Sequence, residues 1–126
     1  MPYEQMNPNK DYDHSVDYWS LGITIYEMAY GVTPFEPSSC EMLTEKEWTK
    51  HIKSNIQKAS IYFPAKSIGL PLKLFMRSLL LPKVQDRLGG DANNMKVKAH
   101  SCFSKIDWNA LFHRTMVPPA LEGIRL

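Results

Sequence analysis

A run of fifteen residues near the N-terminus, Val16–Tyr30 (VDYWSLGITIYEMAY), is apolar on nearly every face and most constrains the fold. It is too long for a typical strand and shorter than the ~18 apolar residues that a membrane-spanning helix requires. We therefore predict a helix that is buried on all sides. The polar interruptions are Asp17, Ser20, Thr24 and Glu27.

Two signals mark the ends of this predicted helix. Ser15 directly precedes the run, and its hydroxyl can accept a hydrogen bond from a first-turn amide, so we expect it to be the N-cap. Gly31 suits the left-handed position that follows a helix, and Pro34 prevents the helix from continuing. The predicted helix is therefore Ser15–Tyr30.

A second helix is predicted over Thr44–Gln57. Thr44 and Glu47 have the spacing of a capping box, in which each side chain bonds an amide at the helix start. Three apolar residues then recur every four positions and define the buried face of an amphipathic helix. They are Trp48, Ile52 and Ile56.

Further helices are expected in the second half of the chain. One begins at Pro71, which suits a first helical turn, and stops before Pro82. A short one is expected over residues 94–99, and the last eighteen residues, 109–126, are expected to be an extended tail. The predicted fold is mainly α, with the central helix surrounded by three or four others. The inward residues of the helix after Pro71 are Leu72, Phe75, Met76, Leu79 and Leu80.

Composition and spacing argue against several classes of function. A formal charge of +2 is too small to favour nucleic acid. Two cysteines, Cys40 and Cys102, make no disulfide framework, and no apolar run could span a membrane. We therefore expect an intracellular, cytoplasmic protein. The histidines, which lie too far apart for zinc-ligand spacing, are His14, His51, His100 and His113.

Several short motifs nevertheless occur in a recognisable order. Residues 17–22 read D-Y-W-S-L-G, and residues 31–35 read G-V-T-P-F. Asp86-Arg87-Leu88-Gly89 follows, and then His100-Ser101-Cys102-Phe103 before Ile106-Asp107-Trp108. Together these motifs resemble the C-terminal lobe of eukaryotic protein kinases, and the last two resemble the AGC group of serine/threonine kinases. The resemblance implies a partial kinase domain over residues 1–117 and the start of an AGC-type tail over residues 118–126.

The resemblance assigns structural roles to single residues. Glu4 and Arg87 match an ion pair that ties the end of the activation segment to the lobe. Asp17 matches an aspartate that accepts amides of the catalytic loop, although it would also favour a helix N-terminus through the macrodipole. The helix Thr44–Gln57 corresponds to a kinase surface that often binds substrates and regulators. The other matched positions are Trp19, Gly22, Pro34, Phe35, His100, Phe103, Asp107 and Trp108.

The motifs that carry kinase chemistry are absent from the 126 residues. No Gly-x-Gly-x-x-Gly, His-Arg-Asp or Asp-Phe-Gly occurs, so we predict no catalytic, cofactor-binding or metal residue in this chain. ATP and Mg²⁺ are implied only for a complete parent kinase. The two main hypotheses are a fragment of a serine/threonine kinase and a catalytically dead interaction module (a pseudokinase acting as decoy or scaffold). An unrelated helical domain conflicts with the ordered motifs.

The same resemblance predicts which partners the chain would have. They are proteins: a substrate, a regulator, a chaperone or a complementary kinase lobe. Without the preceding kinase segments, part of the central helix should face water, for example among Trp19, Ile23, Tyr26 and Tyr30. We therefore expect low stability and self-association.

Overall fold

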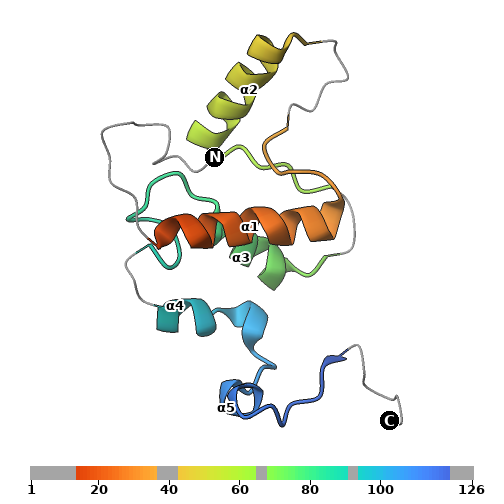
Figure 1. Ribbon diagram of the computed structural model, residues 1–126, viewed down its shortest axis with the longest axis vertical. Coiled ribbons are helices and arrows are strands. Elements are labelled where there is room, and N and C mark those ends of the chain that lie inside the picture. Colours follow the sequence, from red (N-terminus) through yellow and green to blue (C-terminus); the bar gives the residue numbers. More distant parts are fainter. Residues whose placement is uncertain (1–13, 37–42, 65–67, 91–93, 120–126) are drawn as a thin grey trace.

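The computed structural model describes residues 14–36, 43–64, 68–90 and 94–119. Within these ranges there is no strand, and the prediction of a mainly α fold is confirmed. Figure 1 shows α1 across the middle of an elongated molecule, with α3 behind it, α2 above and α4 and α5 below. The elements are α1 (Ser15–Tyr30), α2 (Glu45–Gln57), α3 (Leu70–Leu79), α4 (Asn94–Lys98), the 3-10 helix η2 (Ser101–Phe103) and α5 (Trp108–Phe112).

Only one side of α1 is buried, so the prediction of burial on all sides is wrong for this chain. The buried residues recur every three or four positions and are Ser15, Trp19, Gly22 and Tyr26. Leu21 and Met28, on another side of the helix, are 40% and 75% exposed. The described neighbours pack against one side of the helix, whereas the apolar sequence continues around it. We also expected exposure among Trp19, Ile23, Tyr26 and Tyr30, which is wrong for Trp19 and Tyr26.

The ends of α1 follow the prediction in part. Gly31 adopts the left-handed conformation (φ +77°), and its amide donates to the carbonyl of Glu27 at 2.8 Å, as expected. The N-cap is His14 and not Ser15, which is the first helical residue. The side chain of Ser15 is buried, and its carbonyl accepts a hydrogen bond from Arg87 at 3.2 Å.

The closest helix packing joins α1 to α3 and depends on Gly22. A Cβ atom at Gly22 would lie 2.9 Å from Leu79 Cβ and from Leu80 Cδ2. The two helices can approach this closely because Gly22 has no side chain. The inward residues of α3 were correctly predicted at Phe75, Met76 and Leu79, which are buried.

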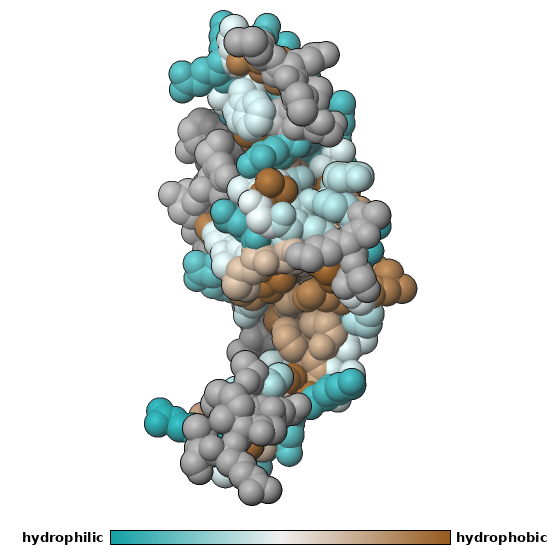
Figure 2. Space-filling view, turned by 90° about the vertical axis from the view of Figure 1, so that its right-hand side faces the viewer, coloured by the Kyte–Doolittle hydropathy of each residue, from teal (hydrophilic) through white to brown (hydrophobic). Residues whose placement is uncertain are grey.

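Two apolar clusters make up the core. The first lies between α1, the loop after it and the end of α2; its buried residues are Trp19, Phe35, Ile56 and Leu80. The second joins α3 to the C-terminal elements; its buried residues are Phe75, Leu79 and Val97. Figure 2 shows apolar surface gathered at the middle height of the molecule, where α3 lies, and hydrophilic surface toward both ends.

The C-terminal segment is partly helical, so the prediction of an extended tail over 109–126 is wrong for its first residues. Asp107 caps α5, because its side chain accepts a hydrogen bond from the amide of Ala110 at 3.0 Å. The residue after α5, His113, donates its amide to Asn109 and Leu111. Residues 120–126 lie outside the described residues.

Candidate functional site

Arg87 is the most deeply placed charged residue among those described, with 3% of its surface exposed. Its guanidinium nitrogens donate to three backbone carbonyls: Leu81 at 2.9 Å, Pro82 at 3.1 Å and Ser15 at 3.2 Å. The same group lies 5.0 Å from the centre of the Trp19 ring. Arg87 therefore ties the loop after α3 to the first turn of α1.

Trp19 and Phe35 bring two of the sequence motifs into contact. Their rings are stacked nearly parallel, at 3° and 5.4 Å between centroids. Pro34 beside Phe35 is also buried. Asn55 of α2 donates its side-chain amide to the Phe35 carbonyl at 3.0 Å, so this loop also holds the end of α2.

A ladder of aromatic rings attaches the C-terminal motifs to α3. The ring centroid of Phe75 lies 5.1 Å from that of His100 and 4.9 Å from that of Phe103. The rings of Phe103 and Trp108 meet edge-on, with 5.2 Å between their centroids. The indole of Trp108 donates to the carbonyl of Lys98 at 3.1 Å. His100 caps η2 by accepting the amide of Cys102 through Nδ1 at 3.2 Å. The side chains of these motifs are therefore used for packing and capping.

Two predicted residues are not part of this buried assembly. Asp17 lies on the first turn of α1 and is exposed, where a carboxylate favours the positive end of the helix dipole. Glu4 lies outside the described residues. The ion pair between Glu4 and Arg87 therefore stays a prediction.

The apolar face predicted for α2 is buried only at its C-terminal end. Ile56 is 2% exposed and belongs to the Trp19 cluster, and Ile52 is partly buried against it. Trp48, one helical turn before Ile52, is 37% exposed. The capping box is confirmed, since Glu47 donates its amide to Thr44 Oγ1 at 3.2 Å and its carboxylate accepts the Thr44 amide at 3.0 Å.

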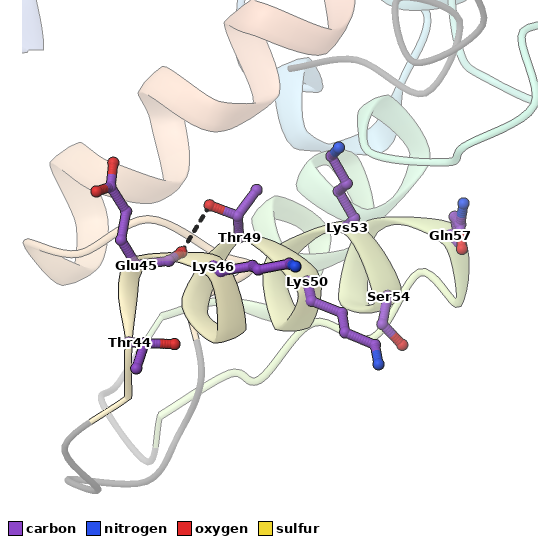
Figure 3. A pocket seen from close by; sticks show the side chains of 8 residues that line it. All are labelled: Thr44, Glu45, Lys46, Thr49, Lys50, Lys53, Ser54 and Gln57. Atoms are coloured by element: carbon purple, nitrogen blue, oxygen red, sulfur yellow. Dashed lines mark hydrogen bonds between the residues drawn. The ribbon is translucent and has the colours of Figure 1, made fainter.

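An open hollow of about 1000 Å³ lies along a different side of α2 (Figure 3). Three of its residues, Lys46, Lys50 and Lys53, follow the i, i+4, i+7 spacing that places residues on one face of a helix. In Figure 3, Lys50 and Lys53 extend toward opposite edges of the helix, with Lys46 between them. The sequence analysis did not predict this hollow, because it considered only the apolar face of the helix. The remaining lining residues are Thr44, Glu45, Thr49, Ser54 and Gln57.

Burial raises the pKa of three of the described side chains. It raises the pKa of the Cys102 thiol and of the Tyr30 hydroxyl above their ordinary values. Burial, followed by the nearby Tyr30, Tyr62 and Glu36, also raises the pKa of Tyr26. These groups are therefore neutral at physiological pH, and a thiol held neutral is a poor nucleophile.

Nowhere in the ranges that the structure describes do three side chains of His, Cys, Asp or Glu come together as metal ligands. The glycine turn at Gly89 follows α3 and lies against the ring of Tyr18. No described helix is long and apolar enough to cross a membrane.

Comparison with known proteins supplies the context for these motifs. The family model described as the protein kinase domain matches residues 1–103. The chain belongs to the protein kinase family. Its matches include serine/threonine kinases of the AGC group, as the order of the motifs predicted.

Individual relatives agree with this assignment. The chain is 32% identical to serine/threonine-protein kinase Sgk2 of Homo sapiens over 108 residues, which is 86% of this chain and 27% of the relative. It is 30% identical to serine/threonine-protein kinase SCH9 of Candida albicans over 92% of this chain and 14% of the relative. It is 29% identical to serine/threonine-protein kinase sck1 of Schizosaccharomyces pombe over 97% of this chain and 16% of the relative.

The chain thus spans about a quarter or less of the length of these relatives. The chain is a fragment of the serine/threonine kinase type, and none of these comparisons favours the dead interaction module.

Proposed function

We propose that this chain supplies part of the helical lobe of an AGC-type serine/threonine kinase that, as a complete enzyme, transfers phosphate from ATP to proteins. The observation that carries the proposal is the cluster of Arg87, Trp19 and Phe35. Each comes from a different kinase-like motif, and the three meet in one buried contact. In this proposal the chain positions the catalytic segments and performs no chemical step.

The proposed division of the chain is a partial kinase domain over 1–117 and the start of a C-terminal tail over 118–126. The match of the family model to residues 1–103 supports the first part. The ring ladder from Phe75 to Trp108 supports extending the domain beyond residue 103, because it packs α5 against the lobe.

The proposed residue roles follow the same logic. Arg87 would receive Glu4 as an ion-pair partner at the end of the activation segment. Asp17 is exposed and so is accessible to amides of a catalytic loop. Trp19, Gly22, Pro34 and Phe35 would hold the lobe together, and His100, Phe103, Asp107 and Trp108 would fasten its C-terminal end.

We also propose that α2 is a protein-docking element through Trp48 and Ile52, next to the buried Ile56. The partial exposure of Trp48 supports this role. The partner would be a substrate, a regulator, a chaperone or a complementary kinase lobe. An intracellular, cytoplasmic location fits an enzyme that uses ATP.

The test begins with the reading frame upstream of Met1, in the transcript that encodes this chain. We expect in-frame His-Arg-Asp and Asp-Phe-Gly, and phosphorylation of serine- or threonine-containing peptides by the full product. A stop codon directly before Met1 would overturn the proposal. The 126-residue chain, used as the control, should neither bind ATP–Mg²⁺ nor label itself with phosphate. Saturable nucleotide binding by this chain would also contradict the proposal.

A further inference from the structure

The N-terminal half of α2 stands away from the rest of the described molecule. Its attachment is concentrated at the C-terminal end, through buried Ile56 and the hydrogen bond from Asn55 to Phe35. All residues from Glu45 to His51 are exposed. Figure 1 shows this helix projecting from one end of the molecule.

The lysine face of α2 carries an unbalanced positive charge. Lys46 and Lys50 are four residues apart and Lys50 and Lys53 are three apart, which are the spacings at which like charges on a helix repel. Within the part of the chain that the structure describes, no carboxylate pairs with any of the three ammonium groups. A ligand with negative charge would relieve this repulsion.

The two glutamates of α2, Glu45 and Glu47, offset only part of the charge of its three lysines and lie at the start of the helix. The Glu47 carboxylate is engaged in the capping box at the helix start. Glu45 lies at the N-terminal end of the hollow, and all three lysines follow it along the helix. A second hollow of about 340 Å³ continues the surface, lined by Leu43, Glu47, Lys50, His51 and Ser54, so Lys50 and Ser54 border both.

The hollow also suits an apolar group. Its lining residues include three lysines and two threonines, whose side chains carry aliphatic carbons beside their polar groups. A partner that matches both properties has carboxylates spaced along a backbone with an apolar side chain between them. Nucleic acid matches less well, because the hollow offers no aromatic side chain on which a base could stack.

We propose that the lysine face of α2, defined by Lys46, Lys50 and Lys53, docks an acidic segment of a partner protein. This inference goes beyond the proposed docking role of α2, which uses Trp48 and Ile52 on another side of the helix, and it names the chemistry of a partner for the lysine face. Binding is measured on the 126-residue chain and does not require phosphate transfer. Either proposal can therefore fail without the other.

The experiment measures fluorescence anisotropy of a labelled peptide of Glu, Asp and Leu added to the chain. A second peptide has Gln and Asn in place of the acids. We expect saturable binding of the acidic peptide that weakens as ionic strength rises, and no binding of the neutral one. The triple variant Lys46→Glu, Lys50→Glu, Lys53→Glu should weaken binding about tenfold or more.

A matched control variant distinguishes binding by the lysine face from an effect of the net charge of the chain. Lys83→Glu, Lys105→Glu, Arg114→Glu makes the same change in net charge at exposed positions outside α2, and it should bind as the wild type does. Circular dichroism checks that both variants remain helical, and a single Lys50→Gln variant replaces a triple variant that does not fold. Equal loss in both triple variants, equal binding of the neutral peptide, or stronger binding of a DNA oligonucleotide would each overturn the proposal.

Discussion

The guanidinium of Arg87 lies over the ring of Trp19, at 5.0 Å from its centroid, although the two residues belong to motifs far apart in the chain. Both side chains are almost fully buried. Three backbone carbonyls hold the guanidinium in this position, so the charge is solvated by the protein itself.

Among the described charged residues, replacing Arg87 should therefore reduce the free energy of unfolding most. Arg87→Ala leaves the carbonyls of Ser15, Leu81 and Pro82 without this donor, and we expect the free energy of unfolding to fall by about 3–5 kcal/mol. Urea denaturation monitored by circular dichroism measures the change. The matched control is Arg77→Ala, since exposed Arg77 only lies over Phe63 at 5.2 Å and should cost about 1 kcal/mol or less.

The same measurement tests the proposed ion pair. Glu4→Ala should cost less than Arg87→Ala, and a double-mutant cycle should show coupling between the two changes. Equal stability of wild type and Arg87→Ala would show that the buried geometry is wrong.

Gly22→Ala should destabilise the chain, although alanine favours a helix. The new Cβ would meet Leu79 and Leu80 at 2.9 Å, so α1 and α3 must separate. We expect a net loss of about 1–3 kcal/mol, measured by thermal unfolding. Gly69→Ala is the control, because its Cβ would meet only Pro71 at 3.7 Å, and its effect should be small. A stabilised Gly22→Ala variant would contradict the close packing.

Tyr30→Phe should leave stability unchanged or raise it by about 1 kcal/mol. In the described residues the Tyr30 hydroxyl is buried and has no hydrogen-bond partner, so removing it removes a desolvation cost. Tyr26→Phe is the matched comparison, because the Tyr26 hydroxyl donates to the carbonyl of Tyr62 and its loss should cost about 1 kcal/mol. Chemical denaturation of both variants should give opposite signs, and a loss in both would contradict the assignment.

Stability should decline in alkaline solution. Burial raises the pKa of Cys102 and that of Tyr26 above their ordinary values, so the folded chain holds these protons more tightly than the unfolded chain. Their contribution is complete below the unfolded values and is lost as pH rises through the raised values. Urea unfolding from neutral pH to above pH 10 measures this slope. Cys102→Ala with Tyr26→Phe should flatten it, and an unchanged slope would contradict the assignment.

The exposed apolar side of α1 should promote self-association. Leu21 and Met28 are 40% and 75% exposed, and replacing both with lysine removes apolar surface without disturbing the buried side. We expect sedimentation velocity to show more monomer for Leu21→Lys, Met28→Lys than for wild type, with the melting temperature unchanged. Ser20→Lys, at an exposed polar position on another side of the helix, should not alter association. A large drop in melting temperature of the double variant would show that this side is buried.

The sequence was sufficient to predict structure where the cause is local. Thr44 and Glu47 bond neighbouring amides, and Gly31 adopts a conformation that glycine tolerates, so both helix ends could be predicted from a few adjacent residues. The order of the kinase-like motifs also identified the family, because a motif is itself a pattern in the sequence.

Only the tertiary structure decided which side of each helix is covered. Apolar residues continue around α1, and the side that is buried depends on where α3 and the loop at Phe35 pack. Ser15 was predicted as a cap by its type, yet its carbonyl binds Arg87, whose position depends on the loop after α3. The exposure of the lysine face of α2 likewise depends on the attachment of that helix near its C-terminal end, through Ile56 and Asn55. Burial depends on neighbours that are distant in the chain, and the hydrophobic periodicity of one helix does not predict where those neighbours pack.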